Sequence, residues 1–260
     1  MCLIAVAWQS HPRYPLVLIA NRDEFHERPS APLGPWPQAP EILGGRDLQA
    51  GGSWLGVHRG GRLAAVTNVR EPLLRSAERS RGALVAEFLA SPEPACAWAE
   101  LLGGSASEYA GYNLLLWDGE ELIYATNRLK PRWESLPPGL YGLSNAGLDT
   151  PWPKLQRARA ALARYLDDGQ EPALLAAFAD ETVAADEALP DTGVGLVMER
   201  ALSPPFIRRP GYGTRCTSLI RLDQQDQLEF LERRHGVDGA PAGDTRLALV
   251  LNRQGAEAAI

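Results

Sequence analysis

The sequence predicts an α+β protein whose sheets are mainly antiparallel. Two observations support this class. Short apolar runs come in pairs that a tight turn separates, as in hairpins, and helical stretches lie between groups of strands instead of alternating with single strands. The chain has 260 residues, of which 45% are hydrophobic and 22% charged, so it can bury a full core. No linker divides it, and we expect a single domain over residues 1–260.

The chain begins with two apolar runs, residues 3–9 and 16–21, on either side of a turn at residues 11–15. Their lengths and their spacing are typical of a β-hairpin. The following stretch, residues 29–40, is rich in Pro and Ala, so we expect an extended surface loop there.

Residues 51–58 and 62–68 form a second predicted hairpin, because Arg59-Gly60-Gly61 between them suits a tight turn. The hydrophobic period then changes to that of a helix. Ser80 can cap a helix that runs to about residue 90, and residues 94–102 form another, which ends at two glycines.

The second half of the chain repeats this order. Residues 112–117 and 121–126 are predicted as a hairpin, and residues 153–166 and 171–179 as helices. Three further strands are expected at residues 215–222, 228–233 and 246–251. A sandwich of two antiparallel sheets with helices outside both uses this order, although periodicity alone does not select it over other α+β folds.

Charge and hydropathy exclude several classes of function. The formal net charge is -6 and no basic cluster is present, so nucleic acid is not an expected partner. The apolar run at residues 3–8 is too short for a signal-peptide core or a membrane span. We therefore expect no membrane segment, and a small-molecule substrate or ligand as the partner.

The cysteines and histidines indicate neither a disulfide framework nor a metal site. The three cysteines, Cys2, Cys96 and Cys216, are odd in number and widely spaced, and the four histidines lack the spacing of metal ligands. Free thiols suit a reducing compartment. We expect a cytoplasmic protein without a metal or cofactor, and the sequence does not predict its oligomeric state.

Cys2 is the first candidate for chemistry. Aminopeptidases trim methionine before a small residue such as cysteine, so we expect Cys2 to carry both a thiol and a free α-amine. Such an amine titrates at about 7.7–8.0, so near neutral pH it can accept the thiol proton, which makes nucleophile and base one residue. Taken alone, however, Cys2 is better explained as a small apolar residue that starts a buried strand.

The tetrapeptide Asn21-Arg22-Asp23-Glu24 ends the second apolar run. Hairpin geometry returns this end of the second strand toward the start of the first, so we expect its residues to lie near Cys2. Arg22 could hold a substrate carboxylate, and Asp23 could pair with the ammonium or orient the base. The alternative interpretation of four polar residues is a solvated turn.

Weaker candidates lie further along the chain. Asn68 follows a predicted strand, Asn145 lies in a Ser-Asn segment, and Arg215 begins a late strand. An Asn amide can donate a hydrogen bond to an oxyanion, and a buried Arg can polarise a carbonyl or fix a carboxylate. Trp54, in a glycine-rich turn, could line a pocket or belong to the core.

Several motifs form a recognisable set: Met1-Cys2-Leu3-Ile4, Asn21-Arg22-Asp23-Glu24, Gly51-Gly52-Ser53-Trp54-Leu55-Gly56, Ser80-Arg81-Gly82, Tyr141-Gly142-Leu143-Ser144-Asn145, Thr150-Pro151-Trp152-Pro153-Lys154 and Tyr212-Gly213-Thr214-Arg215. This set resembles the NRDE family, which is the family of the transport and Golgi organisation 2 proteins. The matches run from the first residue to about position 220, so the resemblance covers nearly the whole chain.

The resemblance implies the four-layer αββα fold of the N-terminal nucleophile (Ntn) hydrolases. In cysteine Ntn hydrolases such as penicillin V acylase and bile salt hydrolase, an N-terminal Cys is followed by an Arg and an Asp at the end of the second strand, then by two asparagines and a later Arg. The matching positions here are Cys2, Arg22, Asp23, Asn145 and Arg215, with Asn68 for the other asparagine. The adjacent Arg22-Asp23 departs from the spacing in those hydrolases.

Two functions from different classes follow from this resemblance. The first is hydrolysis of an amide or thioester, in which Cys2 attacks, its α-amine moves the proton, Asp23 holds the amine and Asn145 stabilises the oxyanion. Arg22 or Arg215 would position the substrate, and further contacts are expected from Asn21, Glu24, Asn68 and Trp54.

The second function is that of a non-catalytic carrier. Animal members of the family have been linked to haem mobilisation and to acyl-CoA or lipid metabolism. The same pocket would then bind haem, acyl-CoA or a related apolar ligand with a carboxylate, held by Arg22 and Arg215, and Cys2 would be a ligand or a bystander. We favour the hydrolase.

Overall fold

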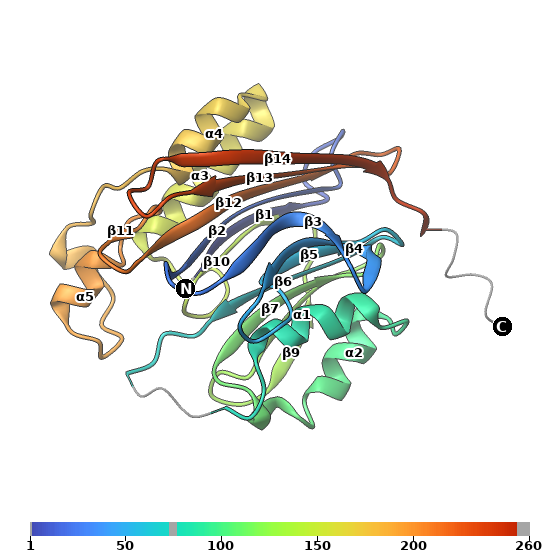
Figure 1. Cartoon of the computed structure of the whole chain (residues 1–260), viewed down its shortest axis with the longest axis horizontal. Helices are drawn as coiled ribbons and strands as arrows, with labels where there is room; N and C mark the ends of the chain where they lie inside the picture. Colours follow the sequence, from blue (N-terminus) through green and yellow to red (C-terminus); the bar gives the residue numbers. More distant parts are fainter. Residues whose placement is uncertain (1, 73–76, 254–260) are drawn as a thin grey trace.

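The computed structural model describes residues 2–72 and 77–253, and it consists of two β-sheets packed face to face (Figure 1). The strands of the first sheet are β1 (Cys2–Trp8), β2 (Leu16–Phe25), β10 (Gly139–Leu143), β11 (Arg208–Arg209), β12 (Tyr212–Leu222), β13 (Gln227–His235) and β14 (Pro241–Val250). Those of the second are β3 (Ser30–Trp36), β4 (Ala39–Asp47), β5 (Leu55–His58), β6 (Arg62–Asn68), β7 (Tyr112–Trp117), β8 (Leu122–Thr126) and β9 (Arg132–Ser135).

The strands of the described chain pair antiparallel in both sheets. The order is β10-β1-β2-β12-β13-β14 in the first sheet, with β11 beside β12, and β3-β4-β5-β6-β7-β8-β9 in the second. The helices are α1 (Arg81–Ala90), α2 (Ala95–Leu102), α3 (Pro153–Asp168), α4 (Glu171–Phe178) and α5 (Leu196–Ala201), with 3₁₀ turns at Ala106–Glu108 and Asp186–Ala188. The expected α+β class with mainly antiparallel sheets is confirmed.

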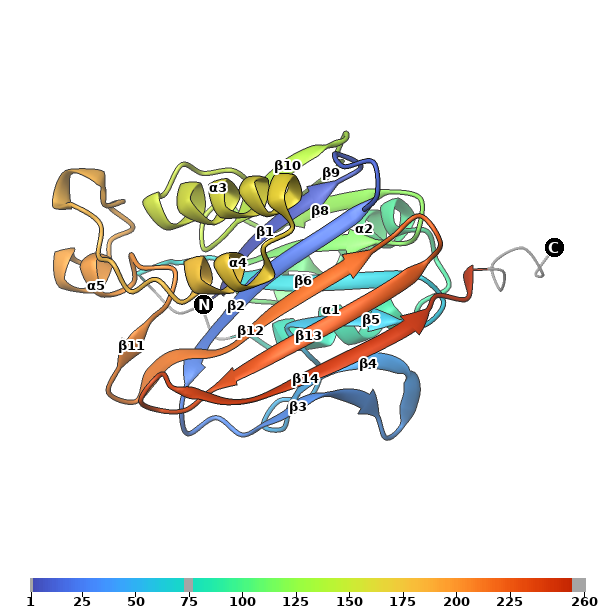
Figure 2. The same ribbon diagram turned by 90° about the horizontal axis from the view of Figure 1, so that it is seen from above.

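Three apolar clusters make this a four-layer αββα structure. The largest lies between the sheets and includes Ile4, Leu18 and Leu115. Another packs Leu3 and Ile19 of the first sheet against helices α3 and α4, and a third packs the outer face of the second sheet against α1 and α2. Figure 2 shows α3 and α4 lying over the first sheet. The layer order implied by the family resemblance is confirmed.

The helix ends follow from local sequence. The Ser80 side chain accepts a hydrogen bond from the backbone N–H of Gly82, as a helix N-cap does. Helix α3 starts at Pro153, whose fixed φ suits the first turn, and ends where Gly169 adopts the left-handed conformation with φ of 67°. No helix in residues 2–72 and 77–253 is long and apolar enough to cross a membrane.

The prediction of a surface loop at residues 29–40 is wrong, because this stretch forms β3 and the start of β4. Proline cannot donate a ladder hydrogen bond and is therefore tolerated at a sheet edge or a bulge. Strand β3 is the edge strand of the second sheet, and its pairing with β4 is interrupted by register shifts near its prolines.

Besides β3 and β4, the strands β9, β10 and β11 were missed, and one strand is shorter than expected. Strand β9 is exposed along its whole length, so it has no apolar alternation, and β10 contains two glycines. The predicted strand at residues 51–58 begins only at Leu55, because Gly51 and Gly52 adopt positive φ. Strand β10 matters for function, since it pairs with β1 and brings the segment that follows it to Cys2.

Candidate active site

Cys2 and Arg22 are direct partners, because β1 and β2 pair antiparallel with these residues opposite each other. Arg22 is in turn opposite Cys216 on β12. Side chains alternate along a strand, so Cys2 shares the face of Ile4, which packs between the sheets. The thiol therefore faces the second sheet, at the rim of the core that the two sheets share.

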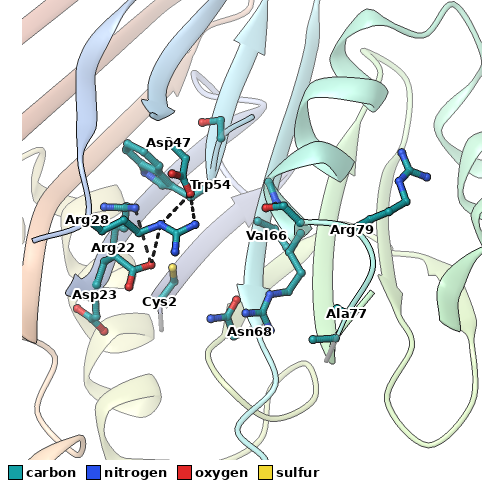
Figure 3. A pocket seen from close by; sticks show the side chains of 16 residues that line it. Cys2, Arg22, Asp23, Arg28, Asp47, Trp54, Val66, Asn68, Ala77 and Arg79 are labelled. Carbon is teal, nitrogen blue, oxygen red and sulfur yellow. Dashed lines mark hydrogen bonds and ion pairs between the residues drawn. The ribbon is translucent and has the colours of Figure 1, made fainter. Parts of the chain in front are cut away.

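A pocket of about 160 Å³ lies between the sheets at this point (Figure 3). Its walls come from β1, β2, β4, β6, the turn before β5 and the start of α1. In Figure 3 the sulfur of Cys2 points toward the side chains of Arg22 and Arg28. Of the site residues predicted from the sequence, the pocket is lined by Cys2, Arg22, Asp23, Glu24, Trp54 and Asn68.

The Cys2 thiol lies in surroundings that favour its protonated form. Burial raises the pKa of the thiol, and the negative charge of Asp23 raises it further. The Arg22 guanidinium and a hydrogen bond from the backbone N–H of Asp23 act in the opposite direction, without reversing the shift. At rest the side chain is therefore a thiol, and a base must take its proton before it can attack.

Arg22 is a buried cation with spare hydrogen-bonding capacity. Its side chain is 5% exposed, and its guanidinium carbon lies 4.3 Å from the centroid of the Trp54 ring. One nitrogen, Nη2, is 3.8 Å from Glu24, but in the described part of the chain no acceptor bonds Nη1. A guanidinium in this state is suited to hold a carboxylate or a carbonyl oxygen of a ligand.

Asp23 is a buried carboxyl close to Cys2. It is 1% exposed, and its Oδ1 accepts a hydrogen bond of 2.7 Å from the Thr214 hydroxyl. Burial raises the pKa of this carboxyl, while the positive charge of Lys154 and the Thr214 hydrogen bond oppose the rise. In Figure 3 the carboxyl points away from the Cys2 sulfur.

The segment after β10 contacts Cys2 through Ser144, whose hydroxyl donates to the Cys2 carbonyl at 3.1 Å. Its neighbour Asn145 is 1% exposed and donates from Nδ2 to the backbone carbonyl of Asn68 at 2.9 Å. Asn68 lines the pocket, whereas Asn145 lies behind it. The structure thus brings both asparagines to the site, with Asn145 holding the backbone of Asn68.

Arg215 lies next to the Cys2 pocket but does not line it. Its Nη1 donates to the backbone carbonyls of Phe25 at 2.7 Å and Arg28 at 3.0 Å, so it fixes the chain that follows β2. Arg215 lines an adjacent pocket of about 190 Å³, which shares Arg22 and Trp54 with the Cys2 pocket.

Asn21 lies on the opposite face of the first sheet from the Cys2 thiol. Its Nδ2 donates to the carbonyls of Phe178 and Pro205, and its Oδ1 accepts from the Thr217 hydroxyl at 2.7 Å. The side chain is fully buried, so its hydrogen bonds tie β2 to the covering helical layer and do not reach the pocket.

Sequence reasoning missed several cations near Cys2, among them Arg81 and Lys154. Arg81 is the first residue of α1, lines the pocket and donates to the Gly111 carbonyl at 3.1 Å. Lys154 is buried under the first sheet, and burial lowers the pKa of its ammonium to about 8. Both residues lie in motifs of the family resemblance, and Lys154 is one of only two lysines. The rarity of lysine in this sequence could have identified Lys154 as a candidate site residue.

No metal site accompanies this pocket in the described ranges. Within residues 2–72 and 77–253, no group of three or more His, Cys, Asp and Glu side chains is arranged to hold a metal ion. Cys2, Cys96 and Cys216 are free cysteines. The chemistry that these residues can support is that of a thiol beside buried carboxylate and guanidinium groups.

The class of protein follows from the layers and from Cys2: a four-layer αββα protein with a cysteine at the start of a central strand, facing a pocket between the sheets. A family model described as Transport and Golgi organisation 2 matches residues 1–236, and the chain belongs to this family. The human Transport and Golgi organization protein 2 homolog is 35% identical over 255 residues, covering 90% of this chain and 92% of the human one. The Drosophila melanogaster protein is 25% identical over 272 residues, covering 89% of this chain and 91% of its own.

Two solved structures are similar in fold. A Caenorhabditis elegans ortholog of N-acylethanolamine-hydrolyzing acid amidase has a TM-score of 0.49 and 9% identity, with 84% of this chain and 92% of that chain covered. The C2A mutant of conjugated bile acid hydrolase from Clostridium perfringens has a TM-score of 0.48 and 9% identity, with 99% and 94% covered.

Proposed function

We propose that this protein is a cysteine Ntn hydrolase that cleaves an amide or thioester bond of a small substrate. The observation that carries the proposal is the position of Cys2, a half-buried free thiol that opens into a pocket lined with charged side chains. A cysteine that only completed a core strand would be surrounded by apolar side chains. Here it lies beside Arg22, Asp23 and Glu24.

The proposed reaction starts with removal of Met1, which gives Cys2 a free α-amine. The raised pKa of the thiol means that this amine must take the thiol proton as the sulfur attacks the carbonyl carbon. The Asp23 carboxylate holds and orients the ammonium that forms. The amine then passes the proton to the leaving nitrogen or sulfur as its bond to carbon breaks, and water hydrolyses the thioester formed on Cys2.

Asn68 is the better candidate for the oxyanion donor. Its side chain lines the pocket, whereas the Asn145 amide is used to hold the Asn68 carbonyl. We assign oxyanion stabilisation to Asn68 and a supporting role to Asn145. Arg22, with a free Nη1 among the described residues, and Arg81 would hold a substrate carboxylate.

The alternative function, a carrier of haem or acyl-CoA, has less support from the pocket. Ligand sites for drug-sized molecules measure roughly 300–1,000 Å³. The Cys2 pocket has about 160 Å³, which suits a small acyl group better than a macrocycle or a long chain. We also propose one domain and a cytoplasmic location, because the sheets share a core and the three cysteines are free.

The test is a panel of N-acyl amino acids and short acyl thioesters, assayed with the purified protein and with Cys2→Ala. We expect turnover by the natural sequence and a loss of at least about a hundredfold in Cys2→Ala, because the nucleophile is gone. Cys96→Ser is the matched control, since Cys96 lies on α2, away from the pocket, and we expect its activity to be unchanged.

Intact mass decides the role of the amine. The active protein should begin at Cys2, and a variant with a residue that blocks Met1 removal inserted after Met1 should be inactive while it remains folded. Full activity in Cys2→Ala, or in a protein that retains Met1, would overturn the proposal. Tight haem or acyl-CoA binding that persists in Cys2→Ala, without turnover of any substrate, would favour the carrier.

A further inference from the structure

Lys154 is a buried cation that the proposed reaction does not use. It is the second residue of α3, is 2% exposed, and no residue in the described part of the chain accepts a hydrogen bond from its Nζ. The chain has 260 residues and only two lysines, and the other, Lys130, is exposed. Burying an ammonium is costly unless a negative charge lies near it. The position of Lys154 therefore needs a partner.

The charges around Lys154 come from four other elements. They are Asp23 at the end of β2, Cys2 on β1, Arg70 after β6 and Glu199 on α5. Burial and the neighbouring Arg70 lower the pKa of Lys154 to about 8, while Asp23, Cys2 and Glu199 act in the opposite direction. Asp23 has the strongest effect of these three neighbours.

Arg70 already has an anionic partner. Arg70 Nη1 lies 2.5 Å from Glu199, and both side chains are at most 5% exposed. The guanidinium of Arg70 also lies 4.7 Å from the Trp152 ring, whereas the Lys154 Nζ is 6.0 Å from the same ring. Lys154, whose Nζ has no hydrogen-bond acceptor in the described ranges, has Asp23 as its strongest anionic neighbour.

Strand alternation places the Asp23 carboxyl on the side of Lys154. Asn21, two residues earlier on β2, reaches the Phe178 and Pro205 carbonyls in the helical layer, so Asp23 belongs to that face. The Tyr212 hydroxyl donates to the Asp23 main-chain carbonyl at 3.2 Å and closes this side of the site.

We propose that Lys154 is a positioning residue of the Cys2 site: its ammonium, from beneath the sheet, keeps the buried Asp23 carboxyl ionised, so that the carboxylate can hold the α-amine of Cys2. The role of the amine rests on the proposed function, but the coupling between Lys154 and Asp23 does not. A protonated Asp23 would lose most of its attraction for an ammonium, so the loss of Lys154 would impair the base at Cys2.

The rarity of lysine makes the coupling directly measurable. Protein labelled with ¹³C at lysine Cε gives two lysine signals, and the exposed Lys130 is the internal reference. We expect the Lys154 signal to titrate near pH 8 and to move down by at least about one pH unit in Asp23→Asn, which is a tenfold loss of proton affinity. Glu199→Gln is the matched control and should shift the signal less, because Glu199 is the weaker neighbour.

The reciprocal measurement uses Lys154→Met, with Lys154→Arg as the variant that keeps the charge. Coupling is mutual, so Lys154→Met should move the titration of Asp23, read by ¹³C at the aspartate carboxyl, upward by the same amount. The rate at which iodoacetamide alkylates Cys2 falls on the acid side of its pH profile, and the midpoint of this fall should move to higher pH together with the Asp23 titration. Lys154→Arg should return both midpoints to their original pH values. Trypsin separates the three cysteines into different peptides, so the Cys2 rate is read by mass.

A Lys154 signal that does not move in Asp23→Asn overturns the inference. If that variant does not fold, an unchanged Asp23 titration in Lys154→Met overturns it equally, and a shifted one supports it. Neither readout needs a substrate. If the Lys154 titration shifts but the protein hydrolyses no substrate, the coupling is supported and the proposed function is not. If the protein turns over a substrate but the Lys154 titration does not shift, the proposed function is supported and the coupling is not.

Discussion

The Arg22 guanidinium carbon lies 4.3 Å from the centroid of the Trp54 ring. Trp54, in the turn before β5 of the second sheet, therefore helps to position the arginine that faces Cys2. The ring is itself fixed, because Gly45 on β4 leaves room for it: a Cβ at Gly45 would lie 2.2 Å from the ring carbon Cη2 of Trp54. The stacked pair separates the Cys2 pocket from the neighbouring pocket that Arg215 lines.

Replacing Trp54 by Leu should weaken substrate binding more than the chemical step. A partly desolvated cation–π contact contributes about 1–2 kcal/mol, so we expect KM to rise about five- to thirtyfold while kcat changes less than about threefold. Steady-state kinetics on the best substrate of the panel would measure this. Trp133→Leu, on the exposed strand β9, is the control. A fall in kcat at constant KM would contradict the binding role.

Substitution of Asn68 should lower kcat, whereas substitution of Asn145 should lower the stability of the protein. We expect Asn68→Ala to lower kcat about 10²- to 10³-fold with little change in stability, because the oxyanion would lose a donor. Asn145→Ala would leave the Asn68 carbonyl without its donor and should lower the free energy of unfolding by about 1–3 kcal/mol. Kinetics and urea denaturation of both variants separate the roles, and equal kcat losses at unchanged stability would argue against them.

The buried ion pair of Arg70 and Glu199 joins α5 to the chain after β6. Removing one partner leaves a buried charge, so Arg70→Met should cost about 3–5 kcal/mol in the free energy of unfolding. The double variant Arg70→Met/Glu199→Leu should recover a large part of this loss. Urea denaturation measures both, and a single variant that costs less than about 1 kcal/mol would count against the pair.

His235 should make the protein less stable in mild acid. Burial lowers the pKa of its ring from 6.5 to about 4, so between these values the unfolded chain binds a proton that the folded chain refuses. Its stabilising contribution is therefore complete above pH 6.5 and is lost as the pH falls toward 4. His235→Gln should reduce the slope of stability by up to about 1.4 kcal/mol per pH unit. An unchanged slope in His235→Gln would contradict this account.

Gly51 and Gly52 offer a matched test of the turn beside the pocket. Both have positive φ, 73° and 75°, but a Cβ at Gly51 meets nothing within 4 Å, whereas one at Gly52 would lie 2.1 Å from the Gly82 carbonyl oxygen. Gly51→Ala should cost about 1 kcal/mol from backbone strain alone, and Gly52→Ala about 2–4 kcal/mol because the clash adds to it. Similar melting temperatures for the two variants would contradict this account.

The hairpin that carries the site could be predicted from the sequence because its signals are local. Residues 3–9 and 16–21 are apolar runs on either side of a short turn, and the antiparallel register then places Arg22 opposite Cys2. The four layers could not be derived in this way. They came from the family resemblance, since periodicity fixes strands and helices but not which faces meet.

The parts that could not be predicted depend on contacts between distant segments. The direction of Asn21 follows from alternation, but its partners lie at Phe178 and Pro205, more than 150 residues away. Lys154 is brought under Asp23 only when α3 packs on the first sheet. The assignment of β3 failed because proline weighs against a strand in general, although a sheet edge tolerates it.

The side chains of the tetrapeptide at the end of β2 have two different roles, one in the stability of the fold and one in the pocket. Arg22, Asp23 and Glu24 line the pocket, whereas the Asn21 side chain and the Asp23 carboxyl belong to the face that the helical layer covers, with Asn21 bonded to it at two carbonyls. Variants at Asn21 should therefore lower the amount of folded protein in a cell, while variants at Arg22 should leave that amount unchanged and remove function. Substitutions at neighbouring positions of this short motif would then abolish function for two different reasons. Those at Asn21 would reduce the amount of folded protein, and those at Arg22 would leave a folded protein with an impaired site.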